Sequence, residues 1–192
     1  MPEVIISAGT PVQLGNLSAR SRSTAGIHFG HMALNIQCHP SVVGWRKLKS
    51  LRVYIDGDPS ARSQPKPFFV KIFSADSLGN LIKDFLGDSI FVQPKWSFFK
   101  PNRWIEIDLQ DRPIFLPVGW IAFGIQMAPL DVIQKMGYDK QFSSYRLYNT
   151  LAVGFTEFEE KSEYGLNSLD CDQELGCKWH GRRLYMIQLA ME

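Results

Sequence analysis

Short runs in which apolar and polar side chains alternate constrain this fold more than any other feature of the sequence. In residues 51–57, "LRVYIDG", Leu51, Val53 and Ile55 alternate with Arg, Tyr and Asp. Residues 104–110, "WIEIDLQ", follow the same pattern. Successive side chains of a β-strand point to opposite faces of its sheet, so this two-residue period predicts strands with one buried face.

Four more segments have the composition of strands. They are residues 28–37 ("HFGHMALNIQ"), 68–75 ("FFVKIFSA"), 119–127 ("GWIAFGIQM") and 183–191 ("RLYMIQLAM"). Segment 119–127 is apolar almost throughout, which predicts a strand covered on both faces. Proline and glycine punctuate the segments between the predicted strands and disfavour long helices there.

Helix is expected only in short pieces. Residues 129–139, "PLDVIQKMGYD", predict one or two helical turns that stop at Gly137, and residues 77–86, "SLGNLIKDFL", are a second candidate for one turn. Many short strands with so little helix predict an all-β fold, a jelly-roll-like antiparallel β-sandwich. We expect a single domain over residues 1–192, because this length suffices for one sandwich core and no linker is evident.

Residues 45–127 contain four motifs in order. They are a D-x-x-G-N corner (Asp76 to Asn80), D-x-I-x-V (Asp88 to Val92), W-I-x-I-D-L (Trp104 to Leu109) and I-x-L-P-x-G-x-x-x-F (Ile114 to Phe123). This block resembles the jelly-roll β-sandwich modules of bacterial surface proteins that accompany carboxypeptidase-regulatory-like domains. The resemblance implies a β-sandwich and a cell-surface or secreted location. It brings no catalytic residues, because these motifs are strand and turn patterns.

The charge and hydropathy of the chain argue against two kinds of partner. The formal net charge is only +2, and the densest basic group is Arg20 and Arg22 in "SARSRS", so we expect no nucleic-acid binding. No apolar run approaches the ~20 residues of a membrane span. The first residues, "MPEVIISAGTPVQ", lack the features of a secretory signal, and the residues alone leave the localisation open.

Three cysteines leave the redox state of the chain open. Cys171 and Cys177 lie close together in "CDQELGC", whereas Cys38 is distant in sequence. An odd count does not indicate a disulfide framework. A local bridge between Cys171 and Cys177 and a pair of reduced thiols are both compatible with the sequence.

One segment contains four acceptable zinc ligands, namely His28, His31, Cys38 and His39. In a strand, however, His28 and His31 would point to opposite faces, and so would the adjacent Cys38 and His39. Ordinary core or surface histidines are therefore the better interpretation. A second group, His180 with Cys171 and Cys177, has no apparent fourth ligand.

Oxygen-bearing side chains recur at Asp76, Asn80, Asp84 and Asp88. The spacing of an EF-hand calcium loop is missing. A corner between two strands explains the same residues, because Asp accepts backbone hydrogen bonds at a turn and Gly-Asn tolerates the left-handed conformation. We expect no cofactor, with one structural calcium ion as the alternative.

No motif for nucleophilic catalysis, phosphate binding or dinucleotide binding is present. Carboxylates that could act on a glycosidic bond exist at Glu106, Asp108, Glu157, Glu159 and Glu160, but the sequence does not pair them at a working separation. We therefore expect a protein without catalytic activity, and a glycan-acting hydrolase is the weaker alternative.

Aromatic residues in predicted loops are the most suggestive feature for binding. The candidate ligand-binding residues are Trp96, Phe98, Phe99, Tyr138, Tyr145 and Trp179, accompanied by Phe142 and Tyr148. Trp104 is a further candidate, because it falls on the polar side of a predicted strand. Aromatic rings on a rigid sandwich can stack on sugars, although aromatics in such folds also fill the core.

These observations predict a non-catalytic binding or adhesion module for carbohydrate or a cell-surface polymer. The alternative is a structural or assembly subunit whose aromatic and apolar edges contact a protein partner. The sequence leaves the ligand and the oligomeric state open.

Overall fold

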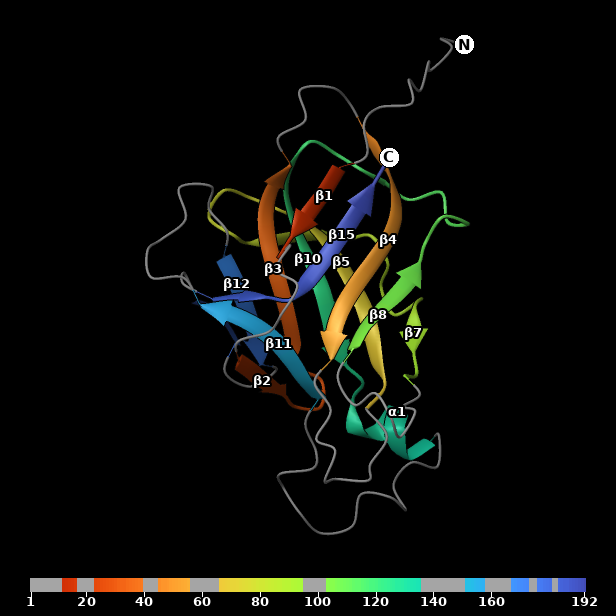
Figure 1. Cartoon of the computed structure of the whole chain (residues 1–192), viewed down its shortest axis with the longest axis vertical. Coiled ribbons are helices and arrows are strands. Elements are labelled where there is room, and N and C mark those ends of the chain that lie inside the picture. The colour runs from red at the N-terminus through yellow and green to blue at the C-terminus, as the bar shows by residue number, and fades with distance from the viewer. Residues whose placement is uncertain are drawn as a thin grey trace.

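Two antiparallel β-sheets form the described part of the chain, as a computed structural model shows (Figure 1). The structure describes residues 12–16, 23–39, 45–55, 66–94, 103–135, 151–157, 167–172, 176–180 and 183–192. Sheet A contains β1 (Val12–Gly15), β2 (Ser23–Ile27), β4 (Arg46–Ile55), β8 (Arg103–Asp108), β9 (Phe115–Leu116), β11 (Leu151–Glu157), β14 (Arg183–Tyr185) and β15 (Ile187–Met191). Sheet B contains β3 (Met32–His39), β5 (Phe68–Ala75), β6 (Leu81–Asp84), β7 (Phe91–Val92), β10 (Gly119–Met127), β12 (Asn167–Asp172) and β13 (Gly176–His180).

The long strands alternate between the two sheets along the chain. β3, β5 and β10 belong to sheet B, whereas β4, β8 and β15 belong to sheet A. Neighbours within a sheet therefore come from distant parts of the chain: β4 lies between β15 and β8, and β10 lies between β3 and β5. This is an all-β sandwich of the jelly-roll kind, which confirms the predicted fold class.

The core lies between the sheets and follows the predicted alternation. Leu51, Val53 and Ile55 of β4 are fully buried. In β10, Phe123 packs into this main core while Ala122, on the other face, packs into a second apolar cluster with residues of β3 and β5. The prediction that this strand is covered on both faces is confirmed.

The helical prediction is confirmed in one place and wrong in the other. Helix α1 spans Leu130–Lys135 and buries Ile133, while the predicted stop Gly137 lies outside the described residues. Within the described ranges no helix has the length and apolar character to cross a membrane. Residues 81–84 form strand β6 rather than a helical turn, because they pair with β5.

Two predicted strands are shorter than their patterns suggested. Residues 28–31 form a turn before β3, closed by the His31 N–H donating to the His28 carbonyl at 3.1 Å. The segment 183–191 breaks at Met186 into β14 and β15.

The fully buried Asn35 of β3 connects sheet B to this break in sheet A. Its Nδ2 donates to the Tyr185 carbonyl at 2.8 Å and to the Ile187 carbonyl at 3.2 Å, and its Oδ1 accepts from the Tyr185 N–H at 2.9 Å. A single amide thus supplies hydrogen bonds to backbone groups on both sides of Met186. The two strands can therefore bend inside the core without losing all their polar contacts.

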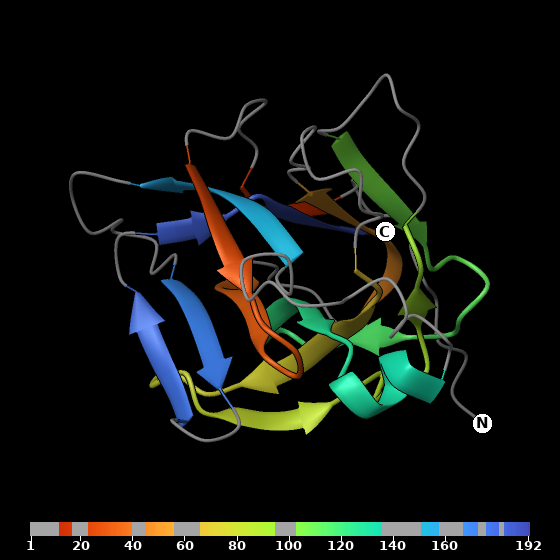
Figure 2. The same ribbon diagram turned by 90° about the horizontal axis from the view of Figure 1, so that it is seen from below.

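Figure 2 views the sandwich from below and shows which elements lie at its edges. Helix α1 lies at one corner, and the hairpin of β12 and β13, in blue, forms the opposite edge of sheet B. β13 is the outermost strand of the sheet B order.

Candidate functional site

Most of the predicted ligand-binding residues lie outside the part of the chain that the structure describes. These are Trp96, Phe98, Phe99, Tyr138 and Tyr145, together with Phe142 and Tyr148. Trp179 belongs to β13, where its backbone is in register with Leu169 of β12. Ligand binding by aromatic residues in loops therefore stays a prediction.

The corner at Asp76 is built by hydrogen bonds to its carboxylate. Oδ1 accepts from the backbone N–H groups of Leu78 and Asn80 at 2.9 and 2.8 Å, and Oδ2 accepts from Asn80 Nδ2 at 2.7 Å. Gly79 has φ +87°, the left-handed conformation expected there. The Asn80 side-chain bond, followed by the backbone bonds, lowers the pKa of Asp76. The prediction of a corner between strands is confirmed.

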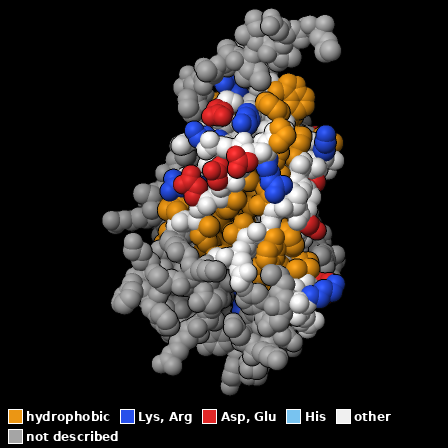
Figure 3. Space-filling model, turned by 90° about the vertical axis from the view of Figure 1, so that its right-hand side faces the viewer, with side chains coloured by type: hydrophobic (Ala, Val, Ile, Leu, Met, Phe, Trp, Pro, Cys, Tyr) orange, Lys and Arg blue, Asp and Glu red, His pale blue; other side chains and the backbone are white. Residues whose placement is uncertain are grey.

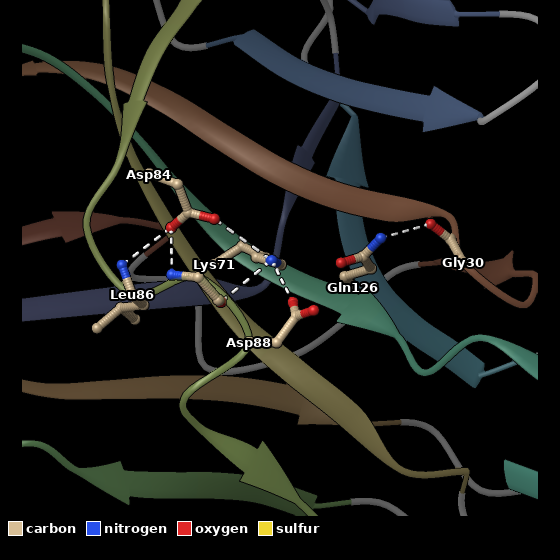
Figure 4. Close-up of polar contacts among 7 residues, drawn as sticks. Gly30, Lys71, Asp84, Leu86, Asp88 and Gln126 are labelled. Carbon is tan, nitrogen blue, oxygen red and sulfur yellow. Dashed lines mark hydrogen bonds and ion pairs between the residues drawn. The ribbon is translucent and has the colours of Figure 1, made fainter. Parts of the chain in front are cut away.

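Asp84 and Asp88 both form ion pairs with the ammonium group of Lys71 (Figure 4). The Lys71 ammonium lies 3.3 Å from Asp84 Oδ2 and 2.7 Å from Asp88 Oδ1, and it donates to the Gly87 carbonyl at 3.1 Å. The Lys71 side chain is only 8% exposed. These carboxylates thus hold the segment after β6 against β5, and the alternative of a structural calcium ion stays a prediction.

The two histidines expected on opposite faces come together. The ring centroids of His28 and His31 are 5.5 Å apart in an edge-on arrangement, because the residues between them form a turn instead of a strand. Cys38 is exposed near the far end of β3. No group of three or more His, Cys, Asp or Glu side chains that could hold a metal ion occurs within the described ranges.

The best-defined candidate site lies on the outer, solvent-facing side of sheet A. The register of β4 and β8 pairs Arg52 with Glu106 and Tyr54 with Trp104, and Gln188 of β15 pairs with Arg52. Cross-strand partners share one face of a sheet, and the inward residues of β4 are buried. These five residues, which we name the Trp104 face, therefore lie together on the outside of the sandwich.

Arg52 occupies the centre of the Trp104 face. Its guanidinium carbon lies 5.2 Å from the centroid of the Trp104 ring, within cation–π range. Tyr54 packs edge-on against Trp104, with 5.7 Å between the ring centroids. The aromatic pair and the guanidinium thus fix one another's positions.

Hydrogen-bonding groups surround these aromatic rings. Arg52 Nη1 donates to Gln188 Oε1 at 3.3 Å, and Gln188 Nε2 in turn donates to the Asn16 carbonyl at 2.9 Å. Arg52 Nε lies 3.8 Å from Glu106 Oε2, beyond hydrogen-bond range, and has no hydrogen-bond partner among the described residues. The Glu106 carboxylate is mostly exposed. The face therefore offers exposed carboxylate oxygens next to an apolar ring, whereas Arg52 Nε is buried.

The part of the surface that carries β7 and β8 combines charged and hydrophobic side chains. Figure 3 shows acidic and basic side chains close together there, next to exposed hydrophobic side chains. A surface of this kind has no single strong sign of charge, which agrees with the absence of a basic patch in the sequence.

Sequence reasoning identified Trp104, and Glu106 as a candidate carboxylate, but missed Arg52, Tyr54 and Gln188. The alternation in residues 51–57 already assigns Arg52 and Tyr54 to the polar side of a strand. Their contact with Trp104, about 50 residues later in the chain, depends on the pairing of β4 with β8. Gln188 was missed for the same reason, because it reaches the site from the last strand.

Comparison of the chain with models of protein families, with curated proteins and with solved structures finds no match in any of the three. The resemblance to surface-protein jelly rolls therefore stays a prediction.

Proposed function

We propose that the chain is a non-catalytic binding module that recognises carbohydrate through the Trp104 face. The carrying observation is the placement of an aromatic pair, a guanidinium, a carboxylate and an amide side by side on the outer side of sheet A. A polymer of a cell surface fits such a site, because an open sheet face accepts a chain that extends past it.

The chemistry of the face matches both sides of a sugar ring. The C–H face of a pyranose is apolar and packs against aromatic rings, which Trp104 and Tyr54 supply. The hydroxyl groups at its edge both donate and accept hydrogen bonds. They can accept from Arg52, donate to Glu106, and do either with the amide of Gln188. Planar side chains can engage two neighbouring hydroxyls at once, which fixes the orientation of the sugar.

The rigidity of the site supports the proposal. All five residues belong to paired strands. Binding a ligand should therefore cost little side-chain entropy, apart from that of the exposed Glu106. Arg52 is already oriented by Trp104 and Gln188 before a ligand arrives.

A glycan array followed by calorimetry with the bound glycan tests the proposal. Trp104→Ala and Arg52→Ala are each expected to weaken binding about tenfold, the equivalent of about 1.4 kcal/mol. Trp45→Ala is the matched control, because Trp45 is 63% exposed and immediately precedes β4, nine residues from Tyr54 and about 30 Å away.

The same assay separates this site from the predicted loops. If Trp96→Ala and Tyr145→Ala abolish binding while Trp104→Ala leaves it unchanged, carbohydrate is bound by the loops and the Trp104 face is not the site. An array on which the wild-type chain binds no glycan overturns the proposal as a whole.

Exposed hydrophobic residues at one edge of sheet B favour assembly as a second candidate function. Leu78, in the corner before β6, is 81% exposed, and Ile82 of β6 itself is 68% exposed. β6 is the outermost strand of the sheet B order at this end. Light scattering that shows a defined oligomer, lost on Leu78→Asp and Ile82→Lys substitution, would support a protein partner at this edge.

A further inference from the structure

The hairpin of β12 and β13 brings two cysteines to directly opposed positions. The register runs from Ser168 opposite His180 to Asp172 opposite Gly176, and within it Cys171 is opposite Cys177. Sequence alone could place these residues only within six positions of each other. The strand pairing makes them a cross-strand pair.

We propose that Cys171 and Cys177 are an oxidisable pair that closes to a disulfide within this hairpin. In an antiparallel ladder the Cα atoms of opposed residues are about 4.5 Å or about 5.5 Å apart, depending on whether the pair is hydrogen-bonded. Disulfides join residues whose Cα atoms lie about 4.4–6.8 Å apart. Both kinds of opposed pair therefore have a Cα separation that a disulfide can span.

The third cysteine cannot compete for either member of the pair in this fold. Cys171 is in register with Met32 at the first residue of β3, and Cys38 lies six residues further along the same strand. At ~3.3 Å per residue the separation is about 20 Å. Cys38 is therefore an internal control for an unpaired thiol.

The oxidant is a small-molecule disulfide such as oxidised glutathione. One cysteine thiolate attacks a sulfur of the oxidant and releases one thiol, which leaves a mixed disulfide on the protein. The other cysteine attacks that mixed disulfide and releases the second thiol. The protein loses two hydrogen atoms and two electrons, and the oxidant becomes two thiols.

Closing the bridge would fasten the outermost strand of sheet B. β13 pairs with β12 in the described ranges, and β12 pairs with β3. Trp179, one of the predicted ligand-binding residues, lies two positions beyond Cys177 in β13. The redox state of the pair would thus govern how firmly this strand is held.

Peptide mapping identifies the bond directly. The segment between Lys161 and Lys178 contains no other tryptic site, so trypsin leaves both cysteines in one peptide. Cleavage after Glu174 then separates them unless the disulfide joins the two fragments. We expect joined fragments after equilibration with oxidised glutathione and free fragments after reduction. Cys38, which is exposed and has no opposed cysteine, should go no further than a mixed disulfide with glutathione and should never join two fragments.

The equilibrium constant tests whether the fold brings the two cysteines together. In a Cys38→Ser chain, the oxidised fraction is measured in glutathione buffers by alkylation and mass, with the chain folded and in urea. A closed loop of seven residues predicts that folding favours the disulfide on the order of 50-fold. The folded chain should therefore be half oxidised at a higher ratio of the squared concentration of reduced glutathione to the concentration of oxidised glutathione than the unfolded chain, by the same factor.

Two results would overturn the proposal. One is an equal midpoint for the folded and the urea-unfolded chain, and the other is a folded chain in which Cys171 and Cys177 form no disulfide with each other at any glutathione ratio. Hydrogen exchange supplies an independent check, because oxidation should slow exchange of β13 amides in the Cys38→Ser chain and leave the Cys38→Ser/Cys171→Ser/Cys177→Ser chain unchanged. Equal β13 exchange rates in both redox states would contradict the fastening of the strand.

Discussion

Replacing Asn35 by alanine should destabilise the sandwich more than the loss of any ordinary hydrogen bond. Asn35 is fully buried, and its amide bonds to Tyr185 and Ile187 across the gap between the sheets. The substitution removes the acceptor of the Tyr185 N–H and one donor from each of two carbonyls. The Ile187 carbonyl keeps a bond from the Asn16 N–H at 3.1 Å, so it loses least.

The magnitude follows from these groups. Depriving a buried N–H of its acceptor costs about 2 kcal/mol, and weakening the two carbonyls adds about 1 kcal/mol. We therefore expect the free energy of unfolding to fall by about 3 kcal/mol. With an m-value of about 2–3 kcal/mol per molar, the urea midpoint should fall by about 1 M.

Urea titration followed by tryptophan fluorescence and far-UV circular dichroism measures this change. Gln126→Ala is the matched control, because its Nε2 donates one bond, to the Gly30 carbonyl at 2.8 Å (Figure 4). The control should cost about 1 kcal/mol. Equal losses for the two variants, or a loss below about 1 kcal/mol for Asn35→Ala, would refute the reasoning.

An isosteric substitution separates the amide's donors from its acceptor. Asn35→Asp keeps an oxygen for the Tyr185 N–H but turns a second oxygen towards two carbonyls. The buried carboxyl should therefore have a raised pKa, because burial and the carbonyl dipoles disfavour its charge. Its contribution to stability is present at low pH and is lost as the pH rises through the folded-state value, so the deficit should shrink from about pH 7 to about pH 4.

Two further substitutions test other buried groups. Lys71→Met should lower the free energy of unfolding by about 2 kcal/mol, less than a fully buried pair costs, because Asp84 and Asp88 keep contact with water. A double-mutant cycle with Asp88→Ala should give losses that are less than additive, and additive losses would contradict the ion pair. Burial lowers the pKa of Lys66 from 10.5 to about 8, so the unfolded chain binds more protons between these values and stability should rise with pH there. Relative to Lys66→Met the wild-type chain should gain on the order of 2 kcal/mol over that interval, measured by urea titration at each pH, and a constant difference would contradict it.

Local sequence determined which residues of the alternating strands face inward and where the chain turns at Asp76. The alternation of Leu51, Val53 and Ile55 predicts their burial, because the side chains of a strand alternate whatever lies beside it. The Asp76 corner is equally local, since its carboxylate bonds only to residues up to four positions ahead. Such features need no knowledge of the partner strand.

The tertiary structure decided which residues are neighbours. Lys71 is charged, yet it is buried because the segment after β6 folds over it. His28 and His31 come together through a turn that the pattern did not distinguish from a strand. The contact of Arg52 with Trp104 likewise exists only because β4 and β8 pair in one register. Register and strand order arise from burying the inner faces of two sheets at once, and a local pattern carries no information about that collective packing.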